Sequence, residues 1–172
     1  MLFRSEKSEG DNIRLAVETK QNVDVSGGTN DEIIQHILYY LLLNDANPGK
    51  RLQAVSLLKT VPAHDNKKLV LISSILSETN AGVRLRALDL LSQFETDKTI
   101  RNACLKILLE DQNEAVRMGA LSILANSPSA DIVPALRVVS LMDQNEYIRE
   151  RAVEVMIDIS YLAEDQALEV IQ

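Results

Sequence analysis

Residues 80–91 read NAGVRLRALDLL, and nearly the same sequence occurs three more times in the chain. NPGKRLQAVSLL begins at Asn47, NEAVRMGALSIL at Asn113 and NEYIRERAVEVM at Asn145, so successive starts lie 33, 33 and 32 residues apart. A period in the low thirties is typical of repeats made of two helices, which stack because one helix pair alone cannot bury its apolar face. The sequence therefore predicts an all-α solenoid.

Aligning the four asparagines puts similar residues at each position of the repeat, and we call such a set a column. Each asparagine is expected to cap the second helix of its unit, because its side-chain oxygen can accept a free backbone N–H at a helix start. Seven residues later every unit has an alanine, where the helices must approach closely. The expected helix pairs are 31–44 with 48–60, 66–77 with 81–94, 98–110 with 114–125, and 131–142 with 146–160.

The predicted fold is a right-handed α-α superhelix of about four helix pairs. Residues 1–30 are expected to be an N-terminal tail with a short β-like cap, and residues 31–172 the repeat domain. The repeat units are expected at 31–63, 64–96, 97–128 and 129–160, with a partial fifth unit at 161–172.

An acidic residue precedes each capping asparagine by two positions, and an arginine follows it by four. At this spacing the arginine can reach an acid of its own or of a neighbouring repeat, in a bidentate contact that also binds turn backbone. We call these residues the ladder: Asp45, Arg51, Glu78, Arg84, Asp111, Arg117, Asp143 and Arg149. Because each arginine has an acid at fixed spacing, a structural role is favoured over a row of arginines that binds phosphate.

The N-terminal residues have a different pattern. Residues 1–10 are polar, show no periodicity and are expected to be mobile. Apolar residues alternate in IRLAVETKQNVDV, residues 13–25, which predicts two short strands with a turn near residues 20–22. Two strands alone are unstable, so they should lie on the exposed apolar end of the first repeat. SGGTN, residues 26–30, is expected to be a flexible link.

The composition limits the classes of function. Of 172 residues, 46% are apolar but only 3% are aromatic, which favours helices over a β-sandwich. The net charge of −7 disfavours a nucleic-acid partner. The most apolar run, residues 33–43, is much shorter than the roughly 20 residues that cross a bilayer, and residues 1–7 lack the apolar region of a signal peptide. We expect a chain that is soluble as written, with no direct membrane insertion.

Few residues could support catalysis or metal binding. The chain has two histidines, His36 and His64, and one cysteine, Cys104, from which no zinc site can be assembled. His36 is expected to be a partly covered helix residue and His64 a loop residue near a helix cap. Cys104 shares a column with three leucines and is expected to be buried. No catalytic residue, metal or cofactor is predicted.

The pattern of an acid, a hydrophobic residue, an arginine and an alanine resembles HEAT repeats, in the short form common in bacterial proteins. The resemblance covers residues 31 to about 160, and repeats of this class serve many functions. The sequence departs from the pattern at Glu78, where aspartate is usual, at Lys50, which replaces a hydrophobic residue, and at Glu150, which interrupts an apolar column. The first and last units are therefore expected to be end caps.

Residues 23–58 are in addition similar to the extracytoplasmic HEAT-repeat tail of bacterial membrane-anchored proteins with an N-terminal zinc-finger, anti-sigma-like domain. That likeness implies that this chain is the extracytoplasmic domain of a longer, membrane-anchored parent. A cytoplasmic location is the alternative.

The second helices also have an outward polar surface of mixed charge. We call it the outer face: Gln53, Ser56, Arg86, Asp89, Gln93, Ser122, Asn126, Arg151 and Glu154. It is either an ordinary solvated surface or a groove for a protein or peptide partner, anchored by Arg86 and Arg151, which lack the fixed acid partner of the ladder arginines. The expected function is a non-catalytic protein-interaction scaffold with a regulatory or sensory role. The alternative is an enzyme of the bilin lyase-like HEAT-repeat class, with a pocket of convergent polar groups.

Overall fold

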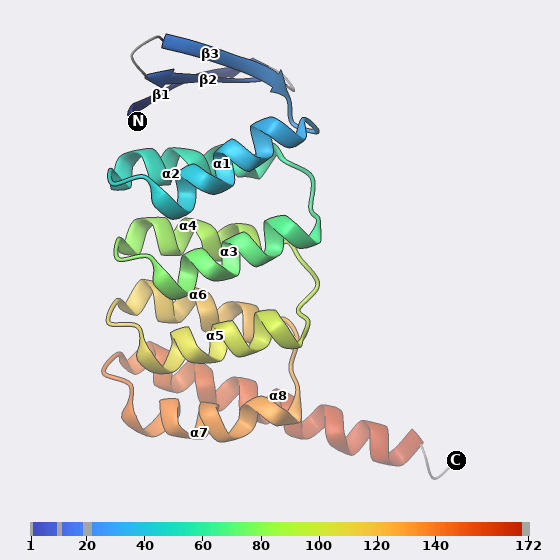
Figure 1. Cartoon of the computed structure of the whole chain (residues 1–172). Helices are drawn as coiled ribbons and strands as arrows, with labels where there is room; N and C mark the ends of the chain where they lie inside the picture. Colours follow the sequence, from blue (N-terminus) through green and yellow to red (C-terminus); the bar gives the residue numbers. More distant parts are fainter. Residues whose placement is uncertain (1, 10–11, 19–21, 170–172) are drawn as a thin grey trace. The chain divides into compact units, whose positions relative to one another are not determined.

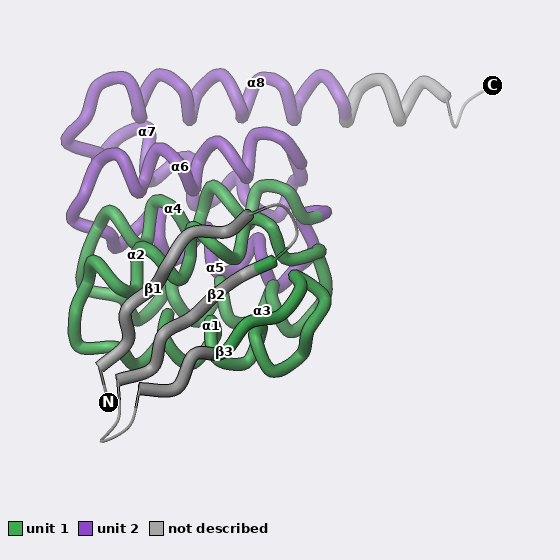
Figure 2. The backbone as a smooth tube through the Cα atoms, turned by 90° about the horizontal axis from the view of Figure 1, so that it is seen from above, with its two compact units in different colours: residues 1–94 green, residues 95–172 purple. Residues whose placement is uncertain are grey.

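The structure is a computed structural model that describes residues 2–9, 12–18 and 22–169. The chain divides into two compact units, residues 1–94 and 95–172, which Figure 2 colours separately. The elements of unit 1 are β1 (Leu2–Glu9), β2 (Asn12–Glu18), β3 (Asn22–Gly28), α1 (Glu32–Asn44), α2 (Pro48–Leu57), the short η1 (Leu58–Thr60), α3 (Asp65–Ser77) and α4 (Ala81–Leu91). The elements of unit 2 are α5 (Lys98–Glu110), α6 (Glu114–Ala125), the short η2 (Ala130–Ile132), α7 (Val133–Met142) and α8 (Glu146–Glu169).

Within each unit two helix pairs are stacked, as expected for an all-α solenoid (Figure 1). In unit 1, α1 packs on α2 and α3 on α4, while α1 also contacts α3 and α2 contacts α4. In unit 2, α5 packs on α6 and α7 on α8, with the same contacts between like helices. First helices therefore form one layer of each unit and second helices the other, which confirms the predicted fold class.

The second helices begin where the asparagines predicted. Asn47 caps α2 by accepting the backbone N–H of Gly49, and Asn80, Asn113 and Asn145 do the same for α4, α6 and α8. The predicted ends differ slightly, because α2 tightens into η1, α4 ends at Leu91 and η2 precedes α7. Short 3₁₀ turns at helix termini are common, and helix boundaries vary by a few residues for that reason.

The core is aliphatic, and its columns are those of the sequence repeat. Leu38, Leu71, Cys104 and Leu136 are completely buried on the first helices. The alanine column is buried on the second helices, at Ala54, Ala87, Ala120 and Ala152. A methyl side chain there lets neighbouring helices approach closely, because a well-packed interior has no room for additional carbon atoms.

The N-terminal residues form a three-stranded antiparallel sheet in the order β1-β2-β3. The predicted hairpin is present as β2 and β3, with Glu18 opposite Asn22; its turn lies outside the described residues. The expectation that residues 1–10 have no structure is wrong for β1, which pairs with β2 so that Phe3 is opposite Val17. An edge strand is held by backbone hydrogen bonds, which need no apolar alternation in its sequence. As predicted, the sheet lies against the first helix pair, with β3 near α1 and β1 near α2 (Figure 1).

The two glycines of SGGTN belong to β3, so this segment is not the flexible link that we expected. A Cβ atom on Gly27 would lie 2.5 Å from Oδ2 of Asp31, the N-cap of α1, and 2.9 Å from Cγ1 of Ile34. Gly27 is therefore required by the close approach of the strand to the start of α1.

α8 continues to Glu169 without a break, so residues 161–169 extend the fourth pair and do not begin a fifth helix pair. Figure 1 shows this extension projecting beyond α7. The sequence has no glycine or proline after Tyr147 that would end the helix.

The alanine column gives a direct test of the packing. Ala120→Leu should lower the free energy of unfolding by roughly 1 to 3 kcal/mol, because Ala120 is completely buried on α6. Ser122→Leu, two residues along the same helix at an exposed position, is the matched control and should change stability by less than about 0.5 kcal/mol. Equal shifts of the urea midpoint in the two variants would contradict the assignment of the column to the core.

Candidate functional site

The turn within each helix pair is built in the same way four times. The acid of the turn accepts the backbone N–H of the capping asparagine: Asp45 from Asn47 at 2.8 Å, and Glu78 from Asn80 at 2.7 Å. The ladder arginine then donates from Nη1 to the backbone carbonyl of that acid, as Arg51 does to Asp45 at 2.7 Å. The equivalent bonds join Arg84 to Glu78, Arg117 to Asp111 and Arg149 to Asp143.

The other edge of the guanidinium bonds the acid of the next helix pair within a unit. In unit 1, Nε and Nη2 of Arg51 donate to the two carboxylate oxygens of Glu78 at 2.5 and 2.7 Å. In unit 2, Arg117 donates in the same way to Asp143, at 2.8 Å for both bonds. Of the two possibilities that the spacing left open, the structure shows the acid of the neighbouring repeat. These contacts are bidentate and charge-assisted, the strongest kind of side-chain hydrogen bond.

The ladder carboxylates are well shielded from water, since the side chain of Asp143 is only 4% exposed. Burial alone would raise the pKa of Asp143, but the bonds from Arg117 and from the backbone N–H of Asn145 outweigh it and hold the pKa below its usual value. The pKa of Glu78 is lowered against burial in the same way by Arg51 and Asn80. Arg51 and Arg117 have both guanidinium edges bonded within the protein, which favours the structural role over phosphate binding.

In unit 1 the outer face includes Gln53, Arg86, Asp89 and Gln93, all exposed, and Ser56, which is half-buried and bonds the carbonyl of Leu52. Arg86 lacks the fixed acid partner of the ladder arginines, as expected, but its Nη1 lies 3.1 Å from Oδ2 of Asp89 on the same helix. The side chain of Arg86 remains 43% exposed. Opposite charges three residues apart on a helix are neighbours, and this is the signal that the column alignment passed over.

In unit 2 the outer face includes Ser122, Asn126 and Glu154, all exposed, and Arg151, which is partly exposed. Arg151 likewise has no ladder acid, but it bonds Glu154 at 2.8 Å, again three residues along the helix. Ser122 donates to the carbonyl of Met118. The second helix pair of each unit thus presents one arginine–carboxylate pair at the surface.

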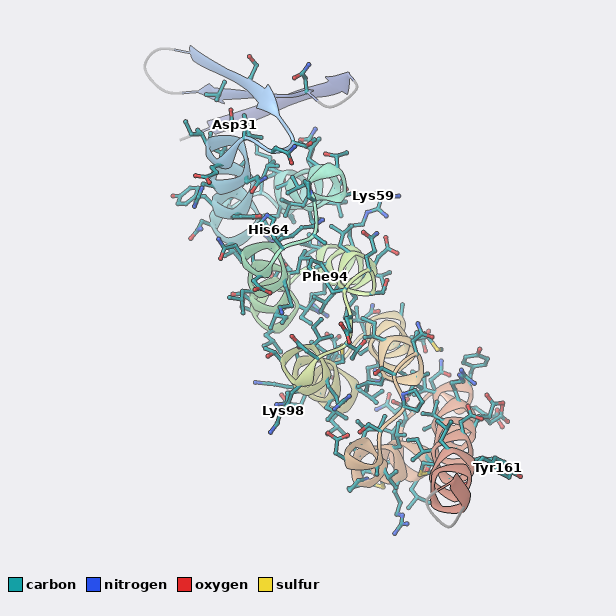
Figure 3. The ribbon with its side chains drawn as sticks, turned by 90° about the vertical axis from the view of Figure 1, so that its right-hand side faces the viewer. Asp31, Lys59, His64, Phe94, Lys98 and Tyr161 are labelled. Atoms are coloured by element: carbon teal, nitrogen blue, oxygen red, sulfur yellow. The ribbon has the colours of Figure 1, made fainter. Side chains whose placement is uncertain are left out.

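A polar cluster in unit 1 has no counterpart in our sequence analysis. His64 caps α3 through Nδ1, which accepts the backbone N–H of Lys67 at 3.3 Å. Its Nε2 must then carry the proton in the neutral ring, and it lies 3.1 Å from the hydroxyl of Tyr39 and 3.2 Å from Oε1 of Gln35. Figure 3 shows His64 at the start of α3. His64, which we expected as a loop residue near a helix cap, is itself the N-cap of α3, whereas His36 is exposed, not partly covered.

Lys67, whose backbone N–H bonds His64, is unusual because this charged residue is only 2% exposed. Its ammonium donates to the carbonyl of Val61 at 2.6 Å and lies 5.9 Å from the ring centre of Phe94. Burial lowers the pKa of Lys67. The same column holds the buried residues Ile34, Ile100 and Ile132, and a lysine among isoleucines is the sequence signal that would have identified it.

Other features of the described residues do not assemble into a chemical site. A hollow of about 190 Å³ lies in unit 2 at the turn ends of α5 and α7, and Arg117 and Asp143 in its lining are bonded to each other. Within the described ranges no three histidine, cysteine, aspartate or glutamate side chains are grouped to hold a metal ion. Cys104 is buried, which raises the pKa of its thiol to about 12. None of the described helices is long and apolar enough to cross a membrane.

Comparisons with known proteins add no family assignment. No protein-family model matches the chain, and no curated protein is similar enough to be identified as a relative.

The ladder can be tested in unit 2. Arg117→Ala should lower the free energy of unfolding by about 3 kcal/mol or more, because it leaves the shielded carboxylate of Asp143 without its partner. Arg137→Ala, at an exposed position of α7, is the control and should have little effect. The measurement is urea unfolding at pH 7, and an unchanged midpoint for Arg117→Ala would contradict the structural role.

The same variant should change the response to acid. The lowered pKa of Asp143 means that the unfolded chain binds more protons than the folded one as pH falls below about 4, so the stabilisation is present above that range and lost below it. Arg117→Ala removes the side-chain bonds that lower the pKa of Asp143, while the bond from Asn145 remains, so this pKa should be higher in the variant and stability should begin to fall at higher pH than in the unmodified protein.

Lys67 predicts a pH dependence of the same sign in the alkaline range. Its lowered pKa means that the unfolded chain binds more protons below about pH 10.5, so the stability of the protein should rise as pH increases toward that value. Lys67→Met should stabilise by on the order of 1 kcal/mol at pH 7, and this advantage should shrink as pH rises. Lys59→Met, at an exposed position, is the control. Thermal melts at pH 7 and pH 10 that show a constant difference would contradict this account.

Proposed function

We propose that this chain is a non-catalytic protein-interaction module of the HEAT-repeat type, which binds a protein or peptide segment along the outer face of its second helices. Support for the repeat type comes from the shared construction of the four turns, in which acid, asparagine and arginine occupy fixed positions. A stack of this kind repeats one local rule, so each unit offers the same kind of surface to an extended partner.

The observation that carries the proposal is the makeup of the outer face in each unit. Neutral polar side chains lie on one second helix of each unit, Gln53 and Ser56 in α2, and Ser122 in α6 with Asn126 at its C-cap. The next second helix adds a surface pair, Arg86 with Asp89 or Arg151 with Glu154. The same combination therefore occurs in both units.

The arginines of these pairs remain available to a partner. An exposed ion pair is screened by water and contributes at most about 1 kcal/mol, so a carboxylate of an incoming segment can replace Asp89 or Glu154 at low cost. The displaced acid is then free to bond a donor of the partner. An extended segment with both acidic and amide groups fits this chemistry.

The test uses photo-crosslinking in native cells. A photoreactive residue at Gln93 or at Ser122, both on the outer face, should form an adduct with the same protein, and one at Asn102, exposed on α5, should not. The double variant Arg86→Glu and Arg151→Glu should weaken binding of that protein by tenfold or more, because two attractive charges become repulsive.

Arg137→Glu, which reverses one charge away from the outer face, should bind normally, and thermal melts should show all variants folded. Adducts of equal yield from Asn102 would contradict the proposal. So would undiminished binding by the double variant Arg86→Glu and Arg151→Glu.

A further inference from the structure

The contact between successive second helices occurs once in each unit, in nearly the same form. In unit 1, α2 contacts α4, Arg51 bonds the acid that precedes α4, and Val55 is 0% exposed. In unit 2, α6 contacts α8, Arg117 bonds the acid that precedes α8, and Leu121 is 0% exposed. In both units, therefore, one second helix contacts the next through a bidentate arginine and an apolar residue four positions later.

α8 repeats this arrangement. On the side of α8 that faces away from α6, the described residues contain no further helix. Arg149 donates from Nη1 to the carbonyls of Asp143 and Gln144, as the other ladder arginines do in their own turns. Its Nε and Nη2, the atoms with which Arg51 and Arg117 bond an acid, have no partner among the described side chains. Val153, in the column of Val55 and Leu121, is 42% exposed.

The exposed apolar residues of α8 continue in the same direction. Val153, Ile157 and Tyr161 recur every four residues, so with Arg149 they form one strip along the helix, which we call the α8 strip. The strip winds around α8, so its end at Ile157 and Tyr161 approaches Glu154 of the outer face, whereas Arg149 and Val153 lie farther from that residue. The described part of the protein thus leaves an apolar strip with an open guanidinium edge at its N-terminal end.

The first-helix side of this end differs from that of the preceding pair. Arg137 and Ser140 of α7 stand in columns where α5 has Leu105 and Leu108, although α7 also exposes Val138, Leu141 and Met142. The two polar replacements favour an occupant that lies mainly on α8.

We propose that the α8 strip binds a helix of a partner protein whose N-terminal turn carries an aspartate or glutamate. The carboxylate bonds Nε and Nη2 of Arg149, as Glu78 bonds Arg51 and Asp143 bonds Arg117, and the apolar face of the helix covers Val153, Ile157 and Tyr161. Charge complementarity selects this occupant, because the open edge of Arg149 has the bidentate geometry that matches a carboxylate.

A second copy of this chain matches the strip less well. In an antiparallel pair of α8 helices, Arg149 of one copy would lie near the other end of the strip, where Ile157, Asp158 and Tyr161 are exposed. Asp158 lies within a helix and does not precede a helix start, as Glu78 and Asp143 do where they bond Arg51 and Arg117.

The probe is a peptide with the sequence of residues 78–94, which comprises Glu78 and α4. In unit 1 this acid bonds Arg51 and this helix packs on α2, so the peptide reproduces the proposed partner. A lactam bridge between positions 89 and 93, both exposed in the protein, keeps it helical, because short helices are otherwise marginal in water. Binding of the fluorescein-labelled peptide to the full chain is measured by fluorescence anisotropy.

Saturable binding is expected, weakened at least tenfold by Glu78→Arg in the peptide or by Arg149→Glu in the protein, and regained when both reversals are combined. Val153→Asp, which leaves the turn bonds of Arg149 intact, should weaken binding as strongly and covers the case in which Arg149→Glu does not fold. Arg137→Glu is the control and should bind normally.

Absence of saturable binding would overturn the proposal. So would equal weakening by Arg149→Glu and Arg137→Glu, or undiminished binding by Val153→Asp. Sedimentation that shows a dimer of the unmodified protein, lost in Val153→Asp, would assign the strip to a second copy instead.

Discussion

The stacking of helix pairs depends on a guanidinium group that bonds in two directions. Arg51 holds the backbone of its own turn with one nitrogen and the carboxylate of the next turn with the other two. Arg117 does the same in unit 2. One side chain thus fixes both the shape of a turn and the position of the following pair, which a contact between aliphatic side chains alone would leave free to slide. The acid serves both purposes too, since it also accepts the N–H of the capping asparagine.

The repeat made most of the helical architecture predictable. Asparagine, acid, arginine and alanine occur at fixed positions, so the capped helix starts, the buried alanines and the residues of the ladder follow from local chemistry. The direction of the ladder could not be predicted, because spacing alone allows an arginine to reach an acid of either repeat. The surface pairs of Arg86 and Arg151 were missed because columns compare repeats and say nothing about neighbours three residues apart on one helix.

The other differences between the sequence analysis and the structure lie where the repeat pattern is absent or interrupted. β1 is recruited by backbone pairing, and its mixed sequence shows no alternation that would reveal it. Gly27 appears to be a sign of flexibility in sequence, but in the structure it is a sign of close contact with Asp31. Lys67 stands where other units have isoleucine, and only its carbonyl partner and the ring of Phe94 make its burial understandable. Buried cations without such partners are costly.

The sheet on the first helix pair has a consequence for assembly. Repeat proteins whose two ends match can join head to tail, and such contacts continue indefinitely because each added copy offers a new end. Here β1 and β3 lie against α1 and α2, where the preceding pair of another copy would have to pack. The end of α8 therefore finds no complementary first pair on a neighbouring copy. Head-to-tail addition of another copy at this face would first require the sheet to leave α1 and α2.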